Sequence, residues 1–287
     1  MRFAFSTLAC PTWSFETIVS RAKEYGYGGV EVRGFLNESI LTSANVFLSD
    51  PGKVREEFAR AGVEIACLAS SISFTGSRRK DRQLAEDVRR FVDTAQGVGS
   101  SYVRIFDTQV RPGQNRAQAA AAFAAWLSPL GDYAAERGVT IIIENALSFR
   151  QAKEMWLILE MFNHPAVGVC WDVFNAALLG EPPSVSVPTL NNRIQYTQVK
   201  DALIGPLGAS FTKLGEGSVR VQDFLKRLRG IGYTRWVTFE WEKAWLPNLA
   251  EPEEVLPDAL KKLKEWTKPQ LEEAGEESDA HPASAHK

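Results

Sequence analysis

The sequence predicts a single (β/α)₈ barrel with parallel strands. One sequence pattern recurs along the chain: a polar helical stretch, a turn that contains glycine, and then a short apolar run. Glycine relieves the left-handed position after a helix, and apolar β-branched runs suit strands that are covered on both faces. An open doubly wound sheet allows the same alternation, but eight such units is a high number for it, so the barrel is favoured.

The residue patterns also predict where individual helices and strands lie. The helices are amphipathic or Ala-rich and are predicted at residues 15–24, 54–61, 117–136 and 253–266. Pro129 lies inside the third of these and predicts a kink or a break there. The apolar runs predict strands at residues 3–5, 30–32, 63–68, 102–106, 139–143, 167–171, 194–199 and 236–239.

Size and charge exclude several classes of protein. The 287 residues include 33 Lys and Arg and 35 Asp and Glu, which leaves a formal net charge of −2. A chain without a global positive field is not typical of nucleic-acid binding proteins. No run approaches the roughly 18 apolar residues of a membrane span. The absence of a signal-peptide pattern and the three widely spaced cysteines favour a reducing, cytoplasmic location.

The composition changes near the C-terminus. We expect the barrel to occupy residues 1–267 and an acidic, disordered tail to occupy residues 268–287, because the tail lacks apolar anchors. His281 and His286 lie in this tail, so His164 is the one histidine in the body of the predicted barrel.

Polar side chains end four consecutive barrel strands. The alternation of side chains along a strand turns Glu144, Asp172, Gln198 and Glu240 toward the barrel interior. Chemistry in such barrels sits at the carboxyl ends of the strands. Three carboxylates this close repel one another unless a cation neutralises them, and oxygen ligands favour Mn²⁺ or Mg²⁺. A single strand-end carboxylate is more commonly a helix cap or an ion-pair partner, but three at matching depth favour a metal site.

These segments resemble the xylose-isomerase-like barrels of the sugar phosphate isomerase/epimerase family. The resemblance spans about residues 2–266, and it lies in the order and spacing of residues 143–145, 171–175, 198–202, 214–217 and 238–240. It implies that Glu144, Asp172, Gln198 and Glu240 hold one divalent metal ion. It further implies that Glu144 and Glu240 exchange protons with a keto-sugar or polyol ketone.

Two positions depart from the family pattern. Gln198 stands where the family has a histidine ligand, and Asn175 stands where its epimerases have another histidine. The amide oxygen of glutamine is compatible with Mg²⁺ or Mn²⁺, whereas Zn²⁺ is disfavoured because no His or Cys remains at this rim. Asn175 is therefore a candidate substrate-binding residue.

Four more side chains are candidates for substrate binding. Trp13, in the first loop after a strand, could form an apolar wall for a sugar. The alternation of side chains also turns Arg33 and Arg104 toward the barrel interior, where they could bind the substrate. An ion pair inside the barrel, with Glu31 as one member, is an equal alternative to substrate binding. Lys200 could bind the substrate or pair with Glu242.

The leading hypothesis is a metal-dependent isomerase or epimerase that works by proton transfer through an enediolate. Two alternatives stay open: a dehydratase of an inosose-type ketone that uses the same parts, and a non-catalytic sugar-binding barrel that has lost its metal. A metal-dependent DNA-repair endonuclease is disfavoured by the shortage of histidines. We expect a small-molecule partner, no nucleic acid and no membrane, and the sequence is compatible with a homo-oligomer.

Overall fold

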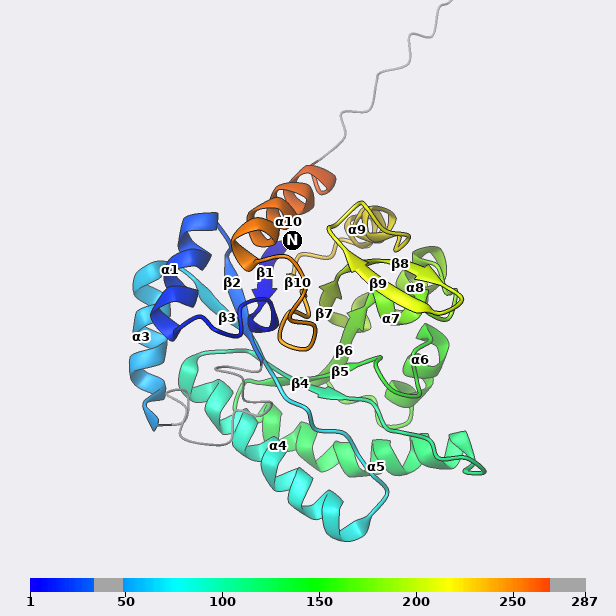
Figure 1. Ribbon diagram of the computed structural model, residues 1–287. Helices are drawn as coiled ribbons and strands as arrows, with labels where there is room; N and C mark the ends of the chain where they lie inside the picture. The colour runs from blue at the N-terminus through cyan, green and yellow to red at the C-terminus, as the bar shows by residue number, and fades with distance from the viewer. Residues whose placement is uncertain (34–48, 269–287) are drawn as a thin grey trace, which may run out of the picture.

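Eight parallel strands close into a barrel in the computed structural model, which describes residues 1–33 and 49–268. The hydrogen-bonded order around the barrel is β1-β10-β7-β6-β5-β4-β3-β2. Figure 1 looks along the barrel, with the strands in the centre and the helices around them. The predicted fold class is confirmed. The strands are β1 (Arg2–Ser6), β2 (Gly29–Val32), β3 (Glu64–Ala69), β4 (Tyr102–Phe106), β5 (Thr140–Glu144), β6 (Val167–Asp172), β7 (Ile194–Val199) and β10 (Trp236–Phe239).

The helices begin and end at local signals in the sequence. Ser14, Asp50 and Asn115 each accept a hydrogen bond from a backbone N–H of the first turn that follows them. Gly26 and Gly62 adopt the left-handed conformation that ends two of the helices. The helices are α1 (Phe15–Tyr25), α3 (Pro51–Ala61), α4 (Arg78–Val98), α5 (Arg116–Ala135), α6 (Ala152–Glu160), α7 (Val173–Ala177), α8 (Pro183–Leu190), α9 (Val221–Gly230) and α10 (Pro252–Trp266).

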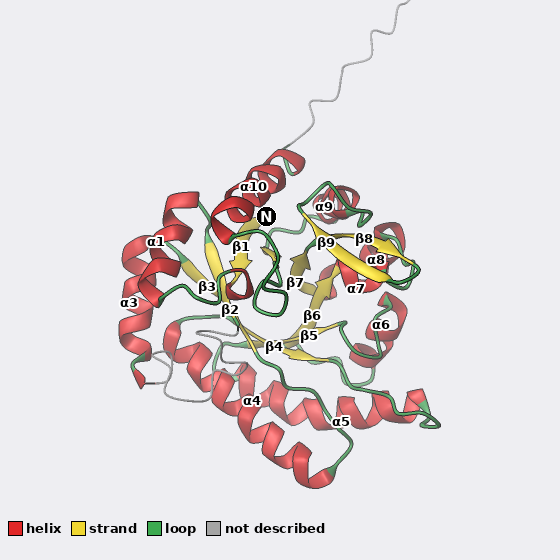
Figure 2. Cartoon of the chain, viewed as in Figure 1, coloured by secondary structure: helices red, strands yellow, loops and turns green. Residues whose placement is uncertain are grey.

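Two features differ from the sequence-based expectation. Helix α5 continues through Pro129, so the predicted break does not occur there. An antiparallel hairpin of β8 (Asp201–Gly205) and β9 (Gly208–Thr212) follows β7 and was not predicted. Figure 2 shows this hairpin outside the ring of strands, beside α7, α8 and α9.

The barrel interior is divided into two layers. Ala4, Cys67, Ile142 and Cys170 form a buried apolar cluster with Ala66, Tyr196 and Trp236, and Tyr102 packs against it. The polar side chains Glu31, Arg104 and Gln198 are buried as well, each at most 1% exposed. The apolar cluster includes residues from the amino ends of the strands, such as Trp236, and the polar residues lie toward the carboxyl ends. The larger hydrophobic core lies between the strands and the helices.

None of the described helices combines the length and the apolar character that a membrane crossing requires. The predicted barrel boundary at residue 267 lies at the end of α10, and the tail from residue 269 onward lies outside the described residues.

Candidate active site

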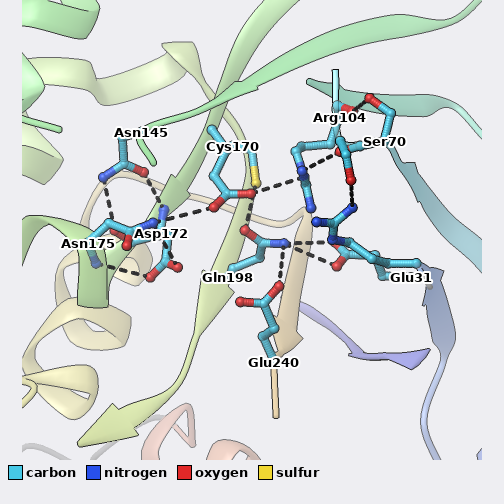
Figure 3. A network of polar contacts seen from close by, with 12 residues as sticks. Glu31, Ser70, Arg104, Asn145, Cys170, Asp172, Asn175, Gln198 and Glu240 are labelled. Carbon is cyan, nitrogen blue, oxygen red and sulfur yellow. Dashed lines mark hydrogen bonds and ion pairs between the residues drawn. The ribbon is translucent and has the colours of Figure 1, made fainter. Parts of the chain in front are cut away.

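The four predicted ligands converge at the carboxyl end of the barrel, together with further charged side chains. Every member of this acid cluster except Asn175 and Glu242 is less than 9% exposed, and Figure 3 shows several of its members. We define the acid cluster as Glu31, Glu144, Asp172, Glu240, Glu242, Gln198, Asn175, Arg33, Arg104 and Lys200.

Asp172 links the end of β6 to the helix that follows it. Its Oδ1 accepts the backbone N–H of Phe174 at 2.8 Å, so the carboxylate caps α7, and its Oδ2 lies 2.9 Å from Lys200 Nζ. The side-chain amide of Asn145 joins this point to β5: it accepts the N–H of Asp172 at 2.8 Å and donates to the Asp172 carbonyl at 3.1 Å. These bonds fix the carboxylate with respect to both strands.

Asn175 connects two of the predicted ligands. Its Nδ2 donates to Glu144 Oε1 at 3.3 Å and to Asp172 Oδ2 at 3.2 Å. Figure 3 shows Asn175, Asp172 and Asn145 together on one side of the network, away from Glu31. The residue that replaces the epimerase histidine thus faces the two carboxylates directly.

Gln198 lies between the carboxylates of opposite strands. Its Nε2 donates to both oxygens of Glu31, at 3.1 and 3.2 Å, and to Glu240 Oε1 at 3.4 Å. Its Oε1 accepts the thiol of Cys170 at 3.5 Å. Figure 3 shows Gln198 in the middle of this group, with Glu31 and Glu240 beside its amide.

Lys200 forms ion pairs with carboxylates, including the pair with Glu242 that was one of the two alternatives for it. Its Nζ lies 2.9 Å from Glu242 Oε1 and contacts Glu240 Oε2 as well as Asp172. Burial alone would lower the pKa of this ammonium group, but the charges of Asp172 and Glu240 outweigh burial and raise it well above its ordinary value. Lys200 therefore stays charged inside the cluster.

Arg104 forms the ion pair inside the barrel that the sequence left open. Its Nε lies 3.0 Å from Glu144 Oε2, and its Nη1 donates to the Ser70 carbonyl at 2.5 Å. Arg33 differs, because the described residues contain no carboxylate in ion-pair contact with it. Of the two alternatives for Arg33, an ion pair with Glu31 is not formed; the Glu31 carboxylate instead accepts hydrogen bonds from Gln198.

The two catalytic candidates have opposite protonation tendencies. Burial raises the pKa of Glu144 to about 8, even though Arg104 acts in the other direction. Burial also acts to raise the pKa of Glu240, but the charge and hydrogen bond of Lys200 outweigh it, so that this pKa lies below its ordinary value. At neutral pH Glu144 tends to keep a proton, and Glu240 is a carboxylate.

The tryptophan candidates lie in different places. Trp13 is buried in the hydrophobic core, where its indole N–H donates to Glu253 Oε1 at 3.2 Å, so its role as a pocket wall stays a prediction. Trp245 is about half exposed, and its ring centroid lies 6.0 Å from the Arg33 guanidinium carbon. Trp245 therefore borders the charged residues.

Sequence reasoning did not single out two positioning residues. Asn145 was noted only as part of a motif. Asp107 follows β4, and its carboxylate accepts the backbone N–H groups of Leu147, Ser148 and Phe149, which holds the loop after Glu144. A polar residue directly after a buried strand was the available signal for both.

The donor chemistry of the cluster fits a divalent cation. Its five carboxyl groups and three basic side chains would carry a net charge of −2 if all were charged, which one divalent ion would neutralise. Within the described ranges, no three His, Cys, Asp or Glu side chains are already arranged around a common metal position. In this structure Lys200 and the amides of Gln198 and Asn175 supply the hydrogen-bond donors between the carboxylates.

The chain is similar in sequence to a curated enzyme. Over 218 residues the chain is 25% identical to a 3-dehydroshikimate dehydratase of Pseudomonas putida, in a match that covers 72% of this chain and 33% of that protein. The chain thus spans about a third of the length of this curated relative.

Two solved structures show the likeness of the fold. The IolI protein, crystallised with a zinc atom, has a TM-score of 0.77 at 17% identity and covers 93% of this chain and 98% of its own. D-allulose 3-epimerase from Methylomonas sp., in complex with D-allulose, has a TM-score of 0.75 at 18% identity, with coverage of 92% and 96%. At these identities the likeness concerns the fold alone.

A family model described as a xylose isomerase-like TIM barrel matches residues 19–266. This range includes seven of the eight barrel strands and all four predicted metal ligands. The chain therefore belongs to the xylose isomerase-like TIM barrel family.

Proposed function

We propose that this protein is an enzyme that moves a proton at the carbon next to the carbonyl group of a small polyhydroxylated substrate, as an isomerase or epimerase. One observation carries the proposal: a single buried cluster holds two carboxyl groups with different partners, Glu240 against the Lys200 ammonium group and Glu144 against Asn175 and Arg104. In these surroundings the pKa of Glu144 is shifted upward and that of Glu240 downward. Such a pair is typical of acid–base catalysis at neutral pH.

Each residue of the cluster has a separate role in the proposed proton transfer. Glu240, kept ionised by Lys200, accepts the proton from the substrate carbon. Glu144, whose carboxyl group lies in the same buried cluster, returns one. Asn175 and Arg104 contact the Glu144 carboxyl group and orient it. The buried surroundings exclude water that would compete for these protons.

The oxygens of Glu144, Asp172, Gln198 and Glu240 are the donors we assign to one divalent ion, Mn²⁺ or Mg²⁺ in preference to Zn²⁺. When bound, such an ion supplies Lewis-acid polarisation of the carbonyl oxygen and stabilises negative charge that develops on it.

A dehydratase is the second candidate. The same first step, followed by loss of a hydroxyl group from the next carbon, is an elimination of water, and protonated Glu144 is placed to supply the proton that the leaving hydroxyl needs. The observation that favours this outcome is the 25% identity to a 3-dehydroshikimate dehydratase.

The experiment is a proton-exchange assay in D₂O. Keto-sugars, inosose-type ketones and hydroxylated keto acids are incubated with the protein and Mn²⁺ or Mg²⁺, and ¹H NMR follows the signal of the hydrogen next to the carbonyl. We expect loss of that signal on at least one substrate class. An epimeric product indicates an epimerase, and a new C=C bond conjugated to the carbonyl indicates a dehydratase.

Glu240→Gln is the test variant, and we expect it to slow exchange by about 10²–10⁴-fold. Glu136→Gln, which changes an exposed carboxylate at the end of α5, is the matched control and should leave the rate unchanged. If the folded wild-type protein binds the cation but exchanges no substrate hydrogen across the panel, the enzyme proposal fails. The non-catalytic sugar-binding barrel would then be the better description.

A further inference from the structure

Arg33 is a buried cation that the proposed mechanism does not use. It follows β2, its side chain is 93% buried, and it differs from Arg104 and Lys200 in having no carboxylate ion pair among the described residues. Its Nη1 donates to Ser71 Oγ at 2.9 Å, which uses one of the five guanidinium N–H groups. A buried charge that is not paired with an opposite charge is costly, and among the described residues no carboxylate offsets this cost by direct contact with Arg33.

The surroundings of Arg33 hold it in place. Its backbone N–H donates to Thr7 Oγ1 at 2.7 Å, and its carbonyl contacts the same hydroxyl, so the end of β2 is fixed to the end of β1. The guanidinium carbon lies 5.5 Å from the ring centroid of Phe106 and 6.0 Å from that of Trp245. Two aromatic rings beside a guanidinium favour its charged form and limit its movement.

Arg33 also lies close enough to the acid cluster to reach a ligand bound there. Burial and then the charge of Arg104 lower the pKa of Arg33 to about 10, while the carboxylates of Glu240 and Glu144 act in the opposite direction. Trp245 is about half exposed, so the part of the acid cluster that contains Arg33 lies near the solvent. A substrate that reaches Glu240 can therefore present a second group to Arg33.

We propose that Arg33 is an anion subsite that binds a carboxylate of the substrate, so that the substrate is a polyhydroxylated carbonyl compound that is also a carboxylic acid. This inference rests on the proposed function for the identity of the reacting part of the substrate. A planar guanidinium binds a planar carboxylate through two parallel hydrogen bonds, and this is the strongest geometry available to it.

The structure favours a carboxylate over a phosphate. Barrels of this class commonly bind phosphate through backbone N–H groups of the loops after the seventh and eighth strands. Here the N–H groups of Gly215, Gly217 and Val219 already bind the carboxylate of Asp201, at 2.8, 3.1 and 3.1 Å. Those three N–H groups are therefore not available to a phosphate, and a single guanidinium matches the single charge of a carboxylate.

The test is a binding measurement that does not depend on turnover. Isothermal titration calorimetry compares quinate, a cyclic polyol carboxylate, with its neutral methyl ester and with fructose 6-phosphate, using wild-type protein loaded with Mg²⁺. We expect quinate to bind about tenfold or more tightly than the ester, because a charge-assisted hydrogen-bond pair is lost in the ester. We expect Arg33→Gln to abolish this preference and Arg33→Lys to keep part of it.

Arg60→Gln, on the exposed face of α3, is the matched control and should bind all three probes as the wild type does. Circular dichroism and the thermal midpoint establish that each variant is folded. An equal preference for quinate in wild type and Arg33→Gln overturns the proposal, as does a preference of the wild type for fructose 6-phosphate over quinate. Failure of the folded wild type to bind any probe at millimolar concentration also counts against it.

The two proposals fail in different ways. Proton exchange on hydroxylated keto acids that Arg33→Gln leaves unchanged would keep the enzyme proposal and remove the carboxylate subsite. Quinate binding that depends on Arg33, without proton exchange on any substrate, would keep the subsite and remove the enzyme proposal.

Discussion

Gln198 illustrates how much one side chain decides in this cluster. Its amide N–H groups lie against Glu31 and Glu240, so a neutral group separates two carboxyl groups that would otherwise repel. A glutamine at this position offers a metal ion an amide oxygen in place of the imidazole nitrogen that transition metals prefer. In the proposed metal site, this residue is therefore the one at which cation selectivity can be tested.

Gln198→His should raise the affinity for Zn²⁺ or Co²⁺ by about tenfold or more, because imidazole is the stronger donor, and should change Mg²⁺ binding much less. Isothermal titration calorimetry on the chelator-treated protein measures both. Gln195→His, on the same strand but partly exposed, is the control and should change neither affinity. Unchanged Zn²⁺ and Co²⁺ affinities in Gln198→His would show that position 198 does not contact the ion.

The alternation of side chains along the strands was enough to predict that Glu144, Asp172, Gln198 and Glu240 converge. It was not enough to predict what lies between them. Lys200 has a long, flexible side chain that can turn toward any of several carboxylates, so its place among Asp172, Glu240 and Glu242 depended on the whole set. The lack of a carboxylate partner for Arg33 within the described residues could not be predicted either, because it depends on the position of Glu31 beside Gln198.

At the scale of elements, the loop after the β8–β9 hairpin is organised by one buried carboxylate. Asp201 accepts backbone N–H groups from Gly215, Gly217 and Val219 across this loop. The sequence motif at residues 214–217 thus has a structural explanation. The hairpin itself was not predicted, because its two short antiparallel strands do not follow the repeat of helix, glycine turn and apolar run that identified the barrel strands.

Gly217→Ala should destabilise the protein by about 1–3 kcal/mol, the usual cost of forcing atoms into a filled space. A Cβ atom there would lie 2.2 Å from Asp201 Oδ1 and 2.6 Å from the backbone N and O of Ala202. Gly230→Ala is the control, since a Cβ atom at Gly230 meets nothing within 4 Å. Chemical denaturation measures both, and equal midpoints for the two variants would contradict the steric argument.

At the scale of the whole molecule, the predicted strand starts agree with the structure to within one residue, since the repeat of helix, glycine turn and apolar run directly reflects the βα unit. The same regularity explains why the fold was easier to predict than the site. Strand positions follow from local sequence, whereas the charge balance of the acid cluster is a property of the closed barrel.

That charge balance predicts how stability depends on pH in the metal-free protein. The pKa of Glu144 is raised by burial from 4.5 to about 8, so the folded state binds a proton that the unfolded state releases above about pH 4.5. The stabilisation from this proton is complete below the unfolded pKa and is lost as the pH rises through about 8. The thermal midpoint in the presence of a chelator should therefore fall between about pH 6 and about pH 9.

Glu144→Gln should show a smaller fall over the same interval, because its neutral amide does not titrate, while Glu136→Gln should follow the wild type. Differential scanning calorimetry at several pH values measures the three curves. A wild-type midpoint that rises with pH, or identical slopes for wild type and Glu144→Gln, would show that Glu144 does not hold this proton.

The apolar cluster at the amino end of the barrel, with Tyr196 and Trp236 buried in it, has a kinetic consequence. Its buried side chains include Trp236, which begins β10 at the amino end of the barrel, whereas the acid cluster lies toward the carboxyl end. An enzyme that works at the acid cluster would therefore take up substrate and release product at the carboxyl end alone. Substrate and product must then pass through the same opening, and one cannot enter before the other has left. Such an enzyme is subject to competitive inhibition by its own product, because product that occupies the site excludes substrate.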